Sequence, residues 1–186
     1  HVECVRLLLG AGASVDLAAT DNGTTPLYMA CIKGHVECVR LLLGAGTSVD
    51  LATTDNGETP LFVACLGGHV ECVRLLLGAG ASVDLERTNV GMTPLCIACH
   101  EGQAECVRLL LGAGASVDSA TTDIGATPLY VSCLRGKVEC VRLLLGAGAS
   151  VDLATTDHRT TPLYIACQVG QVECVRLLLA AGASMD

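Results

Sequence analysis

The sequence predicts an all-α repeat solenoid, in which helix–turn–helix units stack side by side and β-hairpin-type loops join them. Three observations lead to this fold class. The tripeptide Thr-Pro-Leu recurs every 34 residues, starting at residues 25, 59, 93, 127 and 161, and it holds all five prolines. A fixed period of this length is the signature of stacked supersecondary units. Each period also contains two stretches with helical apolar spacing and a turn-forming segment before them.

The first half of each unit predicts a hairpin turn followed by a short helix. In the unit 17–50, Asn-Gly at 22–23 suits a tight hairpin because both residues tolerate positive φ. Thr-Pro at 25–26 then begins a helix, since the threonine hydroxyl can accept from an unpaired amide and proline fits the first helical position. We expect this helix over about 26–33, closed by Gly34 in the left-handed conformation.

The second half of the unit predicts another helix, over about 35–43. Glu37 and Arg40 lie three residues apart on its solvent side and can form an ion pair. Gly-Ala-Gly at 44–46 ends the helix. A helix C-cap explains this segment better than a phosphate-binding loop does, because the glycines follow a helix and do not precede one. Both helices are too short to persist alone in water, so stacking must stabilise them. The apolar residues share one face: Val36, Val39, Leu42 and Leu43.

Four short motifs recur with the period: TPLYMA at 25–30, Gly34-His35, Leu42-Leu43 and a following Gly46. With these motifs the unit resembles the ankyrin repeat, whose signature includes Thr-Pro-Leu-His-x-Ala, Gly-His between the helices, and Leu-Leu before Gly-Ala. Tetratricopeptide repeats share the 34-residue period, but their Trp and paired-helix aromatic pattern is absent. The resemblance covers the whole chain and implies an ankyrin-like stack.

The repeats predict a single ankyrin-repeat domain over 1–186, with a leading half repeat and five full repeats. Two departures from the family pattern stand out. The residue after Thr-Pro-Leu is Tyr, Phe or Cys instead of His, so the hydrogen bonds of that histidine must come from elsewhere. Arg159 occupies a hairpin position where glycine would be easiest. The expected boundaries are 1–16 for the half repeat and 17–50, 51–84, 85–118, 119–152 and 153–186 for the full repeats.

Charge and composition narrow the classes of partner. The formal net charge is −8 and the pI is near 5.0, which argues against nucleic acid and against anionic membrane surfaces. No apolar run approaches the roughly 18 residues that a membrane span needs. We therefore expect the partner to be another protein.

Eleven of the twelve cysteines fall at two fixed phases of the repeat, which predicts small buried side chains and not a disulfide framework. Free thiols in this number persist in a reducing compartment, so we expect an intracellular, cytoplasmic protein. The aromatic residues Tyr28, Phe62, Tyr130 and Tyr164 also share one phase, with Cys96 in the same slot, and packing explains them best. The repeat-phase cysteines are Cys31, Cys65, Cys99, Cys133 and Cys167 in one set, and Cys4, Cys38, Cys72, Cys106, Cys140 and Cys174 in the other.

One cysteine-rich segment resembles two kinds of cofactor site, for haem and for zinc. Cys96-Ile-Ala-Cys99-His100 spells the c-type haem attachment motif, and with Cys106 it offers ligand types for zinc. Haem attachment requires exposed thiols in an oxidising compartment, and Cys99 and Cys106 are already explained by repeat phase. No nucleophile, base and acid converge either. We expect no cofactor, no metal and no enzymatic activity.

Aspartates form two ladders along the repeats. They could attract a basic partner or cations, although hydrogen bonding within turns is the simpler interpretation for Asp. The first ladder follows the second helices and contains Asp16, Asp50, Asp84, Asp118, Asp152 and Asp186. The second lies at the hairpins and contains Asp21, Asp55, Asp123 and Asp157.

Variation among the repeats indicates where a partner would bind. Glu-Cys-Val-Arg-Leu-Leu-Leu occurs six times, whereas the hairpin and the end of the first helix vary. The resemblance implies that these variable positions line a concave groove. Val90, Met92, Ile124 and Leu134 would make the groove apolar in its centre. Drift after duplication is the alternative explanation. The candidate partner-binding residues are Lys33, Glu58, Leu66, Val90, Met92, His100, Glu101, Ile124, Leu134, Arg135, His158 and Gln168.

A different class of function is also open. The segment could be a structural spacer or a self-associating part of a longer repeat array, with recognition elsewhere. Neither terminal unit has the polar outer face that a solenoid needs at its ends, so head-to-tail self-association is expected. An engineered origin is less favoured than a natural repeat fragment, because the cysteines are kept and capping repeats are missing. The apolar residues expected at the ends are Cys4, Val5, Leu8, Val175, Leu178 and Leu179.

Overall fold

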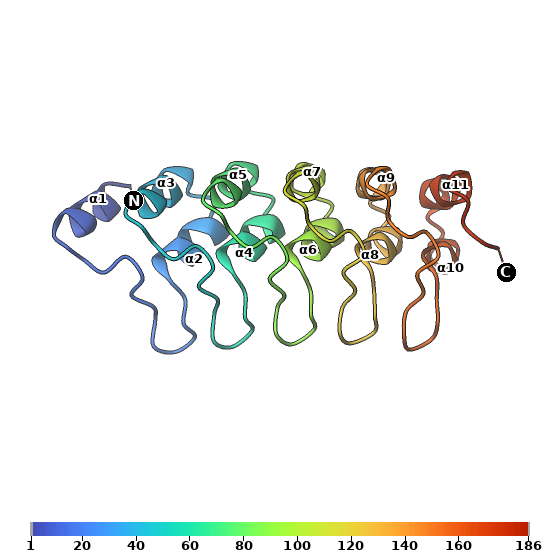
Figure 1. Cartoon of the computed structure of the whole chain (residues 1–186), viewed down its shortest axis with the longest axis horizontal. Coiled ribbons are helices and arrows are strands. Elements are labelled where there is room, and N and C mark those ends of the chain that lie inside the picture. The colour runs from blue at the N-terminus through green and yellow to red at the C-terminus, as the bar shows by residue number, and fades with distance from the viewer. Residues whose placement is uncertain (1, 186) are drawn as a thin grey trace.

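The computed structural model describes residues 2–185, and helices and loops make up this range with a single isolated β-bridge between Arg87 and Met92. Figure 1 shows two parallel rows of helices, with hairpin loops projecting from one side of the stack and the two ends of the chain at opposite ends of it. The predicted all-α repeat solenoid is therefore confirmed. The inner row contains α2 (Pro26–Ile32), α4 (Pro60–Leu66), α6 (Pro94–Glu101), α8 (Pro128–Leu134) and α10 (Pro162–Gln168). The outer row contains α1 (Val2–Gly10), α3 (Val36–Gly44), α5 (Val70–Gly78), α7 (Ala104–Gly112), α9 (Val138–Gly146) and α11 (Val172–Ala180).

The inner helices begin at the predicted Thr-Pro pair. The Thr25 hydroxyl accepts a hydrogen bond from the Tyr28 amide at 3.2 Å, and proline occupies the first turn. The helix α2 ends at Ile32, one residue before the expected Lys33, and Gly34 follows with a φ of +67°. The outer helix α3 extends to Gly44, one residue beyond expectation. Helix ends vary in this way because the last turn is held by few hydrogen bonds.

The core lies between the two rows. Each central inner helix packs against the inner helices on both sides and against the outer helix of its own repeat. Leu27, Val39 and Leu42 show the pattern of a central unit, since all three are buried. Burying these apolar side chains against neighbouring repeats supplies the stabilisation that the short helices lack on their own.

The prediction of buried cysteines at the two repeat phases is confirmed except at Cys4 and Cys167, one in each end unit. Cys4 and Cys167 are exposed, although both occupy repeat phases at which the other cysteines are buried. Tyr164 is likewise 55% exposed, while Tyr28, Phe62 and Tyr130 are buried. The reason is that the first and last units have a neighbour on one side only, so a periodic position that faces the other side stays exposed.

Consecutive hairpins are joined by backbone hydrogen bonds. The Thr54 amide donates to the Asn22 carbonyl at 2.9 Å, and the equivalent bond from Thr156 to the Ile124 carbonyl measures 2.8 Å. These bonds use only the main chain of the variable hairpin residues, so their side chains are free to change. In the last hairpin Arg159 has a φ of +53°, as the sequence predicted for a position that favours glycine.

The first aspartate ladder bonds between repeats. Asp50 accepts hydrogen bonds from the amide and hydroxyl of Ser82, at 3.0 Å and 2.6 Å, and Asp84 holds Ser116 in the same way. Asp186, the last member of this ladder, lies outside the described residues. The prediction that these aspartates accept hydrogen bonds is confirmed. The bonds link neighbouring repeats, however, and do not close a turn within one repeat. Among residues 2–185, no helix is long and apolar enough to cross a membrane.

Candidate protein-binding surface

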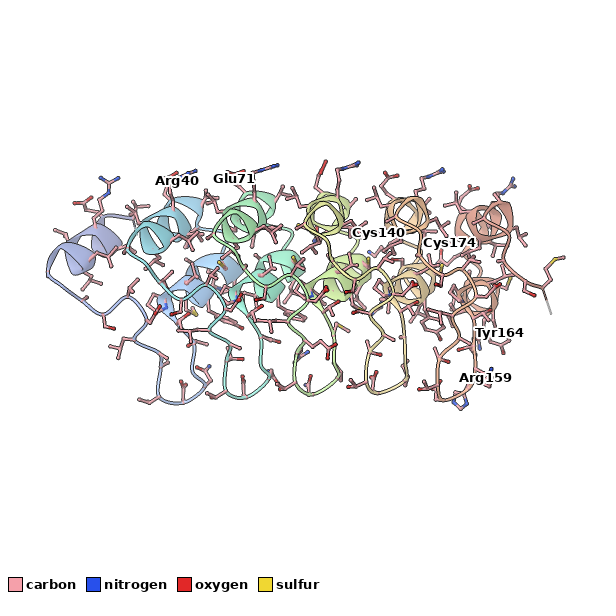
Figure 2. All side chains as sticks on the ribbon, in the orientation of Figure 1. Arg40, Glu71, Cys140, Arg159, Tyr164 and Cys174 are labelled. Atoms are coloured by element: carbon pink, nitrogen blue, oxygen red, sulfur yellow. The ribbon has the colours of Figure 1, made fainter. Side chains whose placement is uncertain are left out.

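The structure divides the twelve predicted binding residues into two groups. Eight of them are exposed: Lys33, Leu66, Glu101, Ile124, Leu134, Arg135, His158 and Gln168. The other four are half-buried: Glu58, Val90, Met92 and His100. Val90 and Met92 are therefore less accessible than the sequence interpretation assumed. Figure 2 shows that Arg40 and Glu71 lie on the outer helices, at the edge opposite the hairpin tip with Arg159.

Three of the exposed or half-buried residues form a polar network at the ends of the inner helices. His100 Nδ1 lies 2.7 Å from Glu101 Oε1, and Arg135 Nε donates to His100 Nε2 at 2.9 Å. Arg135 Nη2 also contacts the same nitrogen. Nε2 thus faces the Arg135 guanidinium, and Nδ1 faces the Glu101 carboxylate. This network joins α6 to the residue that follows α8.

Apolar side chains flank that network. Leu66 ends α4 and Leu134 ends α8, and they are 36% and 37% exposed. Both occupy the repeat phase of His100, so successive inner helices present Leu66, His100 and Leu134 in a row. We call Leu66, His100, Glu101, Leu134 and Arg135 the helix-end patch. It combines apolar surface with one acidic and one basic side chain.

A second network ties the hairpins to each other. The Tyr28 hydroxyl donates to Glu58 Oε2 at 2.9 Å, and Arg87 Nε lies 3.2 Å from Glu58 Oε1. The Glu58 side chain is only 16% exposed, so it is engaged within the stack. Burial, together with the hydrogen bond to Glu58 and its charge, raises the pKa of Tyr28 above its ordinary range. Three successive repeats thus contribute one residue each.

Arg87 was not among the residues predicted to be functional, although its departure from the repeat pattern could have identified it. It stands at the hairpin phase where three of the other repeats have a buried threonine, Thr53, Thr121 and Thr155, and the first full repeat has Ala19. In those repeats the threonine hydroxyl accepts from an amide of its own hairpin, as Thr53 does from Glu58 at 3.1 Å. A long cation at this phase must find a carboxylate elsewhere, and Glu58 of the preceding repeat provides it.

Residues thirty positions apart match each other across the repeats. Tyr28 bonds to Glu58, and Tyr130 accepts a hydrogen bond from Thr160 at 3.3 Å, each pair with a separation of 30. By position in the repeat, the same register pairs apolar Phe62 with Met92, which packs on the buried core, and small Cys96 with buried Ala126. Polar, apolar and small residues are therefore matched within the pairs. Complementarity with the preceding repeat accounts for much of the variation at this hairpin position.

The second aspartate ladder remains exposed at the hairpin tips. Asp55, Asp123 and Asp157 each accept a hydrogen bond from the next amide, at 2.7, 2.7 and 2.6 Å. The hydroxyl of Thr53 is the main cause that lowers the pKa of Asp55, and the hydroxyl of Thr121 does the same for Asp123. For Asp157 the main cause is the His158 amide. Local hydrogen bonds thus hold these exposed carboxylates in the charged form.

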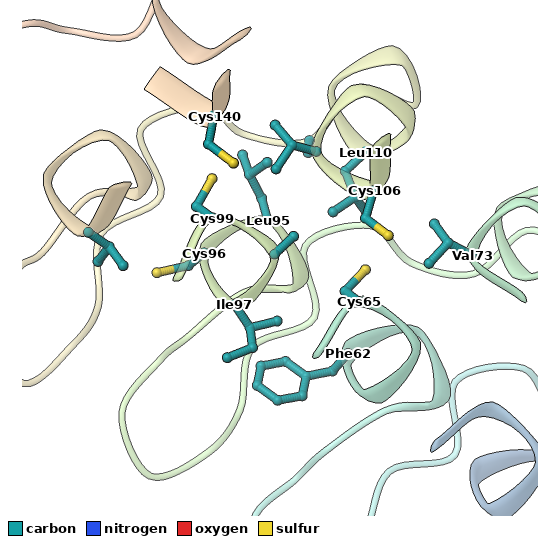
Figure 3. Packing of buried hydrophobic residues seen from close by; sticks show 14 of the residues in the cluster. Phe62, Cys65, Val73, Leu95, Cys96, Ile97, Cys99, Cys106, Leu110 and Cys140 are labelled. Atoms are coloured by element: carbon teal, nitrogen blue, oxygen red, sulfur yellow. The ribbon is translucent and has the colours of Figure 1, made fainter. Parts of the chain in front are cut away.

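The residues considered for haem or zinc do not converge. Cys96 and Cys99 are fully buried, which is unlike the exposed thiols that haem attachment needs. Figure 3 shows that the sulfur of Cys99 points toward Cys140, that of Cys106 points toward Cys65, and that of Cys96 points away from both pairs. Within residues 2–185, no group of three or more His, Cys, Asp or Glu is arranged to hold a metal ion.

Comparison with known proteins agrees with this architecture. Two models of ankyrin repeats cover the chain: one for three copies matches residues 45–121 and 116–186, and one for many copies matches residues 1–43. The crystal structure of the human ASB11 ankyrin repeat domain is similar over the whole of this chain and 80% of that one, with 36% sequence identity and a TM-score of 0.87. No curated protein sequence matches the chain. The chain belongs to the ankyrin repeat family.

Proposed function

We propose that the chain is a non-catalytic module that binds another protein through the helix-end patch and the neighbouring hairpin tips. Ankyrin repeats are in general protein–protein interaction modules. The observation that supports the helix-end patch is the exposure of Leu66 and Leu134, each of which is more than a third accessible. The charged side chains of Glu101 and Arg135 are exposed beside them. Apolar surface with a polar rim is typical of an interface.

The proposed surface is narrower than the variable positions of the sequence. Glu58 is held by Tyr28 and Arg87, and Met92 packs against the core, so both serve stacking in this proposal. Ile124 and His158 remain accessible at the hairpin tips, beside the charged Asp123 and Asp157. Lys33 and Gln168 extend the row of inner-helix ends toward the two ends of the stack.

Capture of partners by paired variants tests the proposal. The immobilised chain is incubated with an extract of its organism of origin, and the recovered proteins are compared for Leu134→Ser/Arg135→Ala and for Arg74→Ala/Arg108→Ala. The second variant is a matched control, because Arg74 and Arg108 are exposed on outer helices and form ion pairs within those helices, at 3.4 Å and 3.3 Å. Circular dichroism must show that both variants are folded.

We expect a specific protein to be lost with the helix-end variant and kept with the control. Truncating a central interface residue costs about 1–2 kcal/mol or more, which lowers affinity about tenfold or further. Equal recovery of every protein by both variants contradicts the proposed surface. Equal loss with the outer-helix variant would place recognition on the other face.

A second candidate function is self-association as part of a repeat array, and the end faces favour it. At one end Leu7 and Leu8 are 67% and 59% exposed. At the other, Tyr164, Leu179 and Met185 line an open cavity. Leu178 was expected at this end face from the sequence, but it is fully buried. The exposed aromatic side chain at this face is that of Tyr164. Light scattering at rising concentration should show association that Tyr164→Ser/Leu179→Ser weakens, and a clean monomer at high concentration contradicts it.

A further inference from the structure

Cysteines of neighbouring repeats meet in pairs inside the stack. Each pair joins an inner helix to the outer helix of the following repeat, and the two thiols hydrogen-bond to each other. Figure 3 shows the sulfurs of two such pairs pointing toward one another between the helices. All members of these pairs are buried, with exposures of 0% or 1%. The pairs are Cys65 with Cys106, Cys99 with Cys140, and Cys133 with Cys174.

We propose that these three pairs are latent disulfides, which an oxidant closes to staple each repeat to the next. Figure 3 shows the sulfurs of Cys65 and Cys106, and those of Cys99 and Cys140, aimed at each other between the helices, which is the placement that a disulfide across two repeats requires. Since a solenoid is held only by contacts between neighbouring units, a covalent link across one such contact blocks the local separation of two repeats. The chain would then resist unfolding more strongly when oxidised than when reduced.

The reaction needs a disulfide oxidant such as glutathione disulfide. One cysteine of the pair attacks a glutathione sulfur as its thiolate, forms a mixed disulfide and releases one glutathione thiol. The second cysteine then attacks the protein sulfur of that mixed disulfide and releases the other glutathione. The two protein thiols lose two electrons and two protons in total, and glutathione disulfide gains them.

In the Cys65–Cys106 and Cys99–Cys140 pairs the outer-helix cysteine is the better first nucleophile. The hydrogen bond donated by Cys65 lowers the pKa of the Cys106 thiol, and Cys99 acts in the same way on Cys140. The pKa of Cys65 is raised by that hydrogen bond and by burial, and the pKa of Cys99 is raised chiefly by burial. Because both sulfurs are buried, the oxidant reaches them only when adjacent repeats open transiently.

Two sites in the same chain provide internal controls. Cys96 is as fully buried as Cys99 and lies on the same helix, but its sulfur points away from both neighbouring pairs. Cys31 and Cys72 occupy the paired phases one repeat earlier, and burial is the main cause that raises the pKa of both thiols. Oxidation that follows pairing should close the three pairs and leave Cys96 as a thiol, and Cys31–Cys72 shows whether the repeat phase alone is sufficient.

The experiment uses the full chain with Cys4→Ser and Cys167→Ser, since these exposed thiols would otherwise link molecules together. The reduced, folded protein is incubated with glutathione disulfide, remaining thiols are alkylated, and cross-linked peptides are identified by mass spectrometry. A parallel sample is oxidised in urea, where pairing no longer depends on the fold. Thermal unfolding is then recorded for the oxidised and reduced forms, and again for a Cys140→Ala variant.

We expect the folded sample to give the three predicted cross-links within single molecules, and the urea sample to give mixed pairings. The unfolding midpoint should rise on oxidation, and the rise should be smaller with Cys140→Ala, which removes one staple. Three results would overturn the proposal: thiols that stay fully reduced while folded, cross-links that include Cys96 as often as Cys99, or a midpoint that does not rise when the predicted cross-links are present.

Discussion

The imidazole of His69 lies against Gly34 of the preceding repeat, so closely that a Cβ at Gly34 would be 2.5 Å from His69 Nδ1. His69 Nε2 also lies 3.3 Å from the Ile32 carbonyl, to which it can donate. The same stacking recurs as Gln103 on Gly68 and Gln171 on Gly136. The glycine after each of the first four inner helices therefore has two functions: it adopts positive φ, and it leaves room for a side chain of the next repeat.

Gly34→Ala should destabilise the chain more than Gly170→Ala does. Both glycines have similar positive φ, +67° and +74°, so each alanine costs about 1–2 kcal/mol of left-handed strain. Only Gly34 has a neighbour, since nothing lies within 4 Å of a Cβ at Gly170. Urea unfolding of the two variants measures the difference. A His69→Ala background should reduce the cost of Gly34→Ala, and equal costs for both glycines would show that the contact is unimportant.

Exchanging a matched pair should preserve stability better than exchanging one member. Tyr130→Phe with Thr160→Met reproduces the combination of Phe62 and Met92, so the double variant should be more stable than the sum of the single variants by about 1 kcal/mol. Thr160→Met alone sets an apolar side chain against the Tyr130 hydroxyl, which now bonds to Thr160. A double-mutant cycle by urea unfolding gives the coupling. Tyr130→Phe combined with the distant Arg74→Met is the control and should be additive.

The Asp16 carboxylate should make folding sensitive to acid. The Thr47 hydroxyl is the main cause that lowers the pKa of Asp16, with the Ser48 amide and hydroxyl adding to it. Because this pKa is lower in the folded than in the unfolded chain, the stabilisation is complete above the ordinary pKa of Asp and is lost as the pH falls through the folded value. The window lies below about pH 4.

Thr47→Ala tests the role of that hydroxyl. Alanine already stands at this phase in the next three repeats, at Ala81, Ala115 and Ala149, so the variant should fold normally. We expect the pKa of Asp16 to rise toward its ordinary value and the acid unfolding midpoint to move to higher pH. Carbon NMR titration of the Asp16 carboxyl measures the first effect, and an unchanged titration would contradict it.

Arg159→Gly should stabilise the last hairpin. Arg159 is the only residue other than glycine with positive φ within residues 2–185, and glycine removes a steric cost of about 1 kcal/mol at that conformation. Arg159→Ala is the control, because alanine keeps the same conformational cost and should give no gain. The midpoint of thermal unfolding distinguishes them. A gain shared by alanine would instead assign the effect to the loss of the arginine charge.

Repeat phase predicted much of this structure. The Thr-Pro pairs located the starts of the inner helices, and the apolar spacing located the outer ones, because a cap and a helical period are local features. Of the candidate surface, phase identified Leu66, Leu134 and Arg135, which are accessible. It did not reveal that Glu58 is engaged by Tyr28 and Arg87, since a variable position can face either solvent or another repeat.

The sequence by itself determined the stack, its period and the local conformation of each unit, because these depend on residues close together in the chain. Only the tertiary structure decided how units meet. Asp50 reaches Ser82 over a separation of 32, Tyr28 reaches Glu58 over 30, and Arg135 reaches His100 over 35. None of these equals the 34-residue period, because elements of unlike position in the repeat come into contact when helices and hairpins pack. A period reports which residues are equivalent, and packing decides which residues touch.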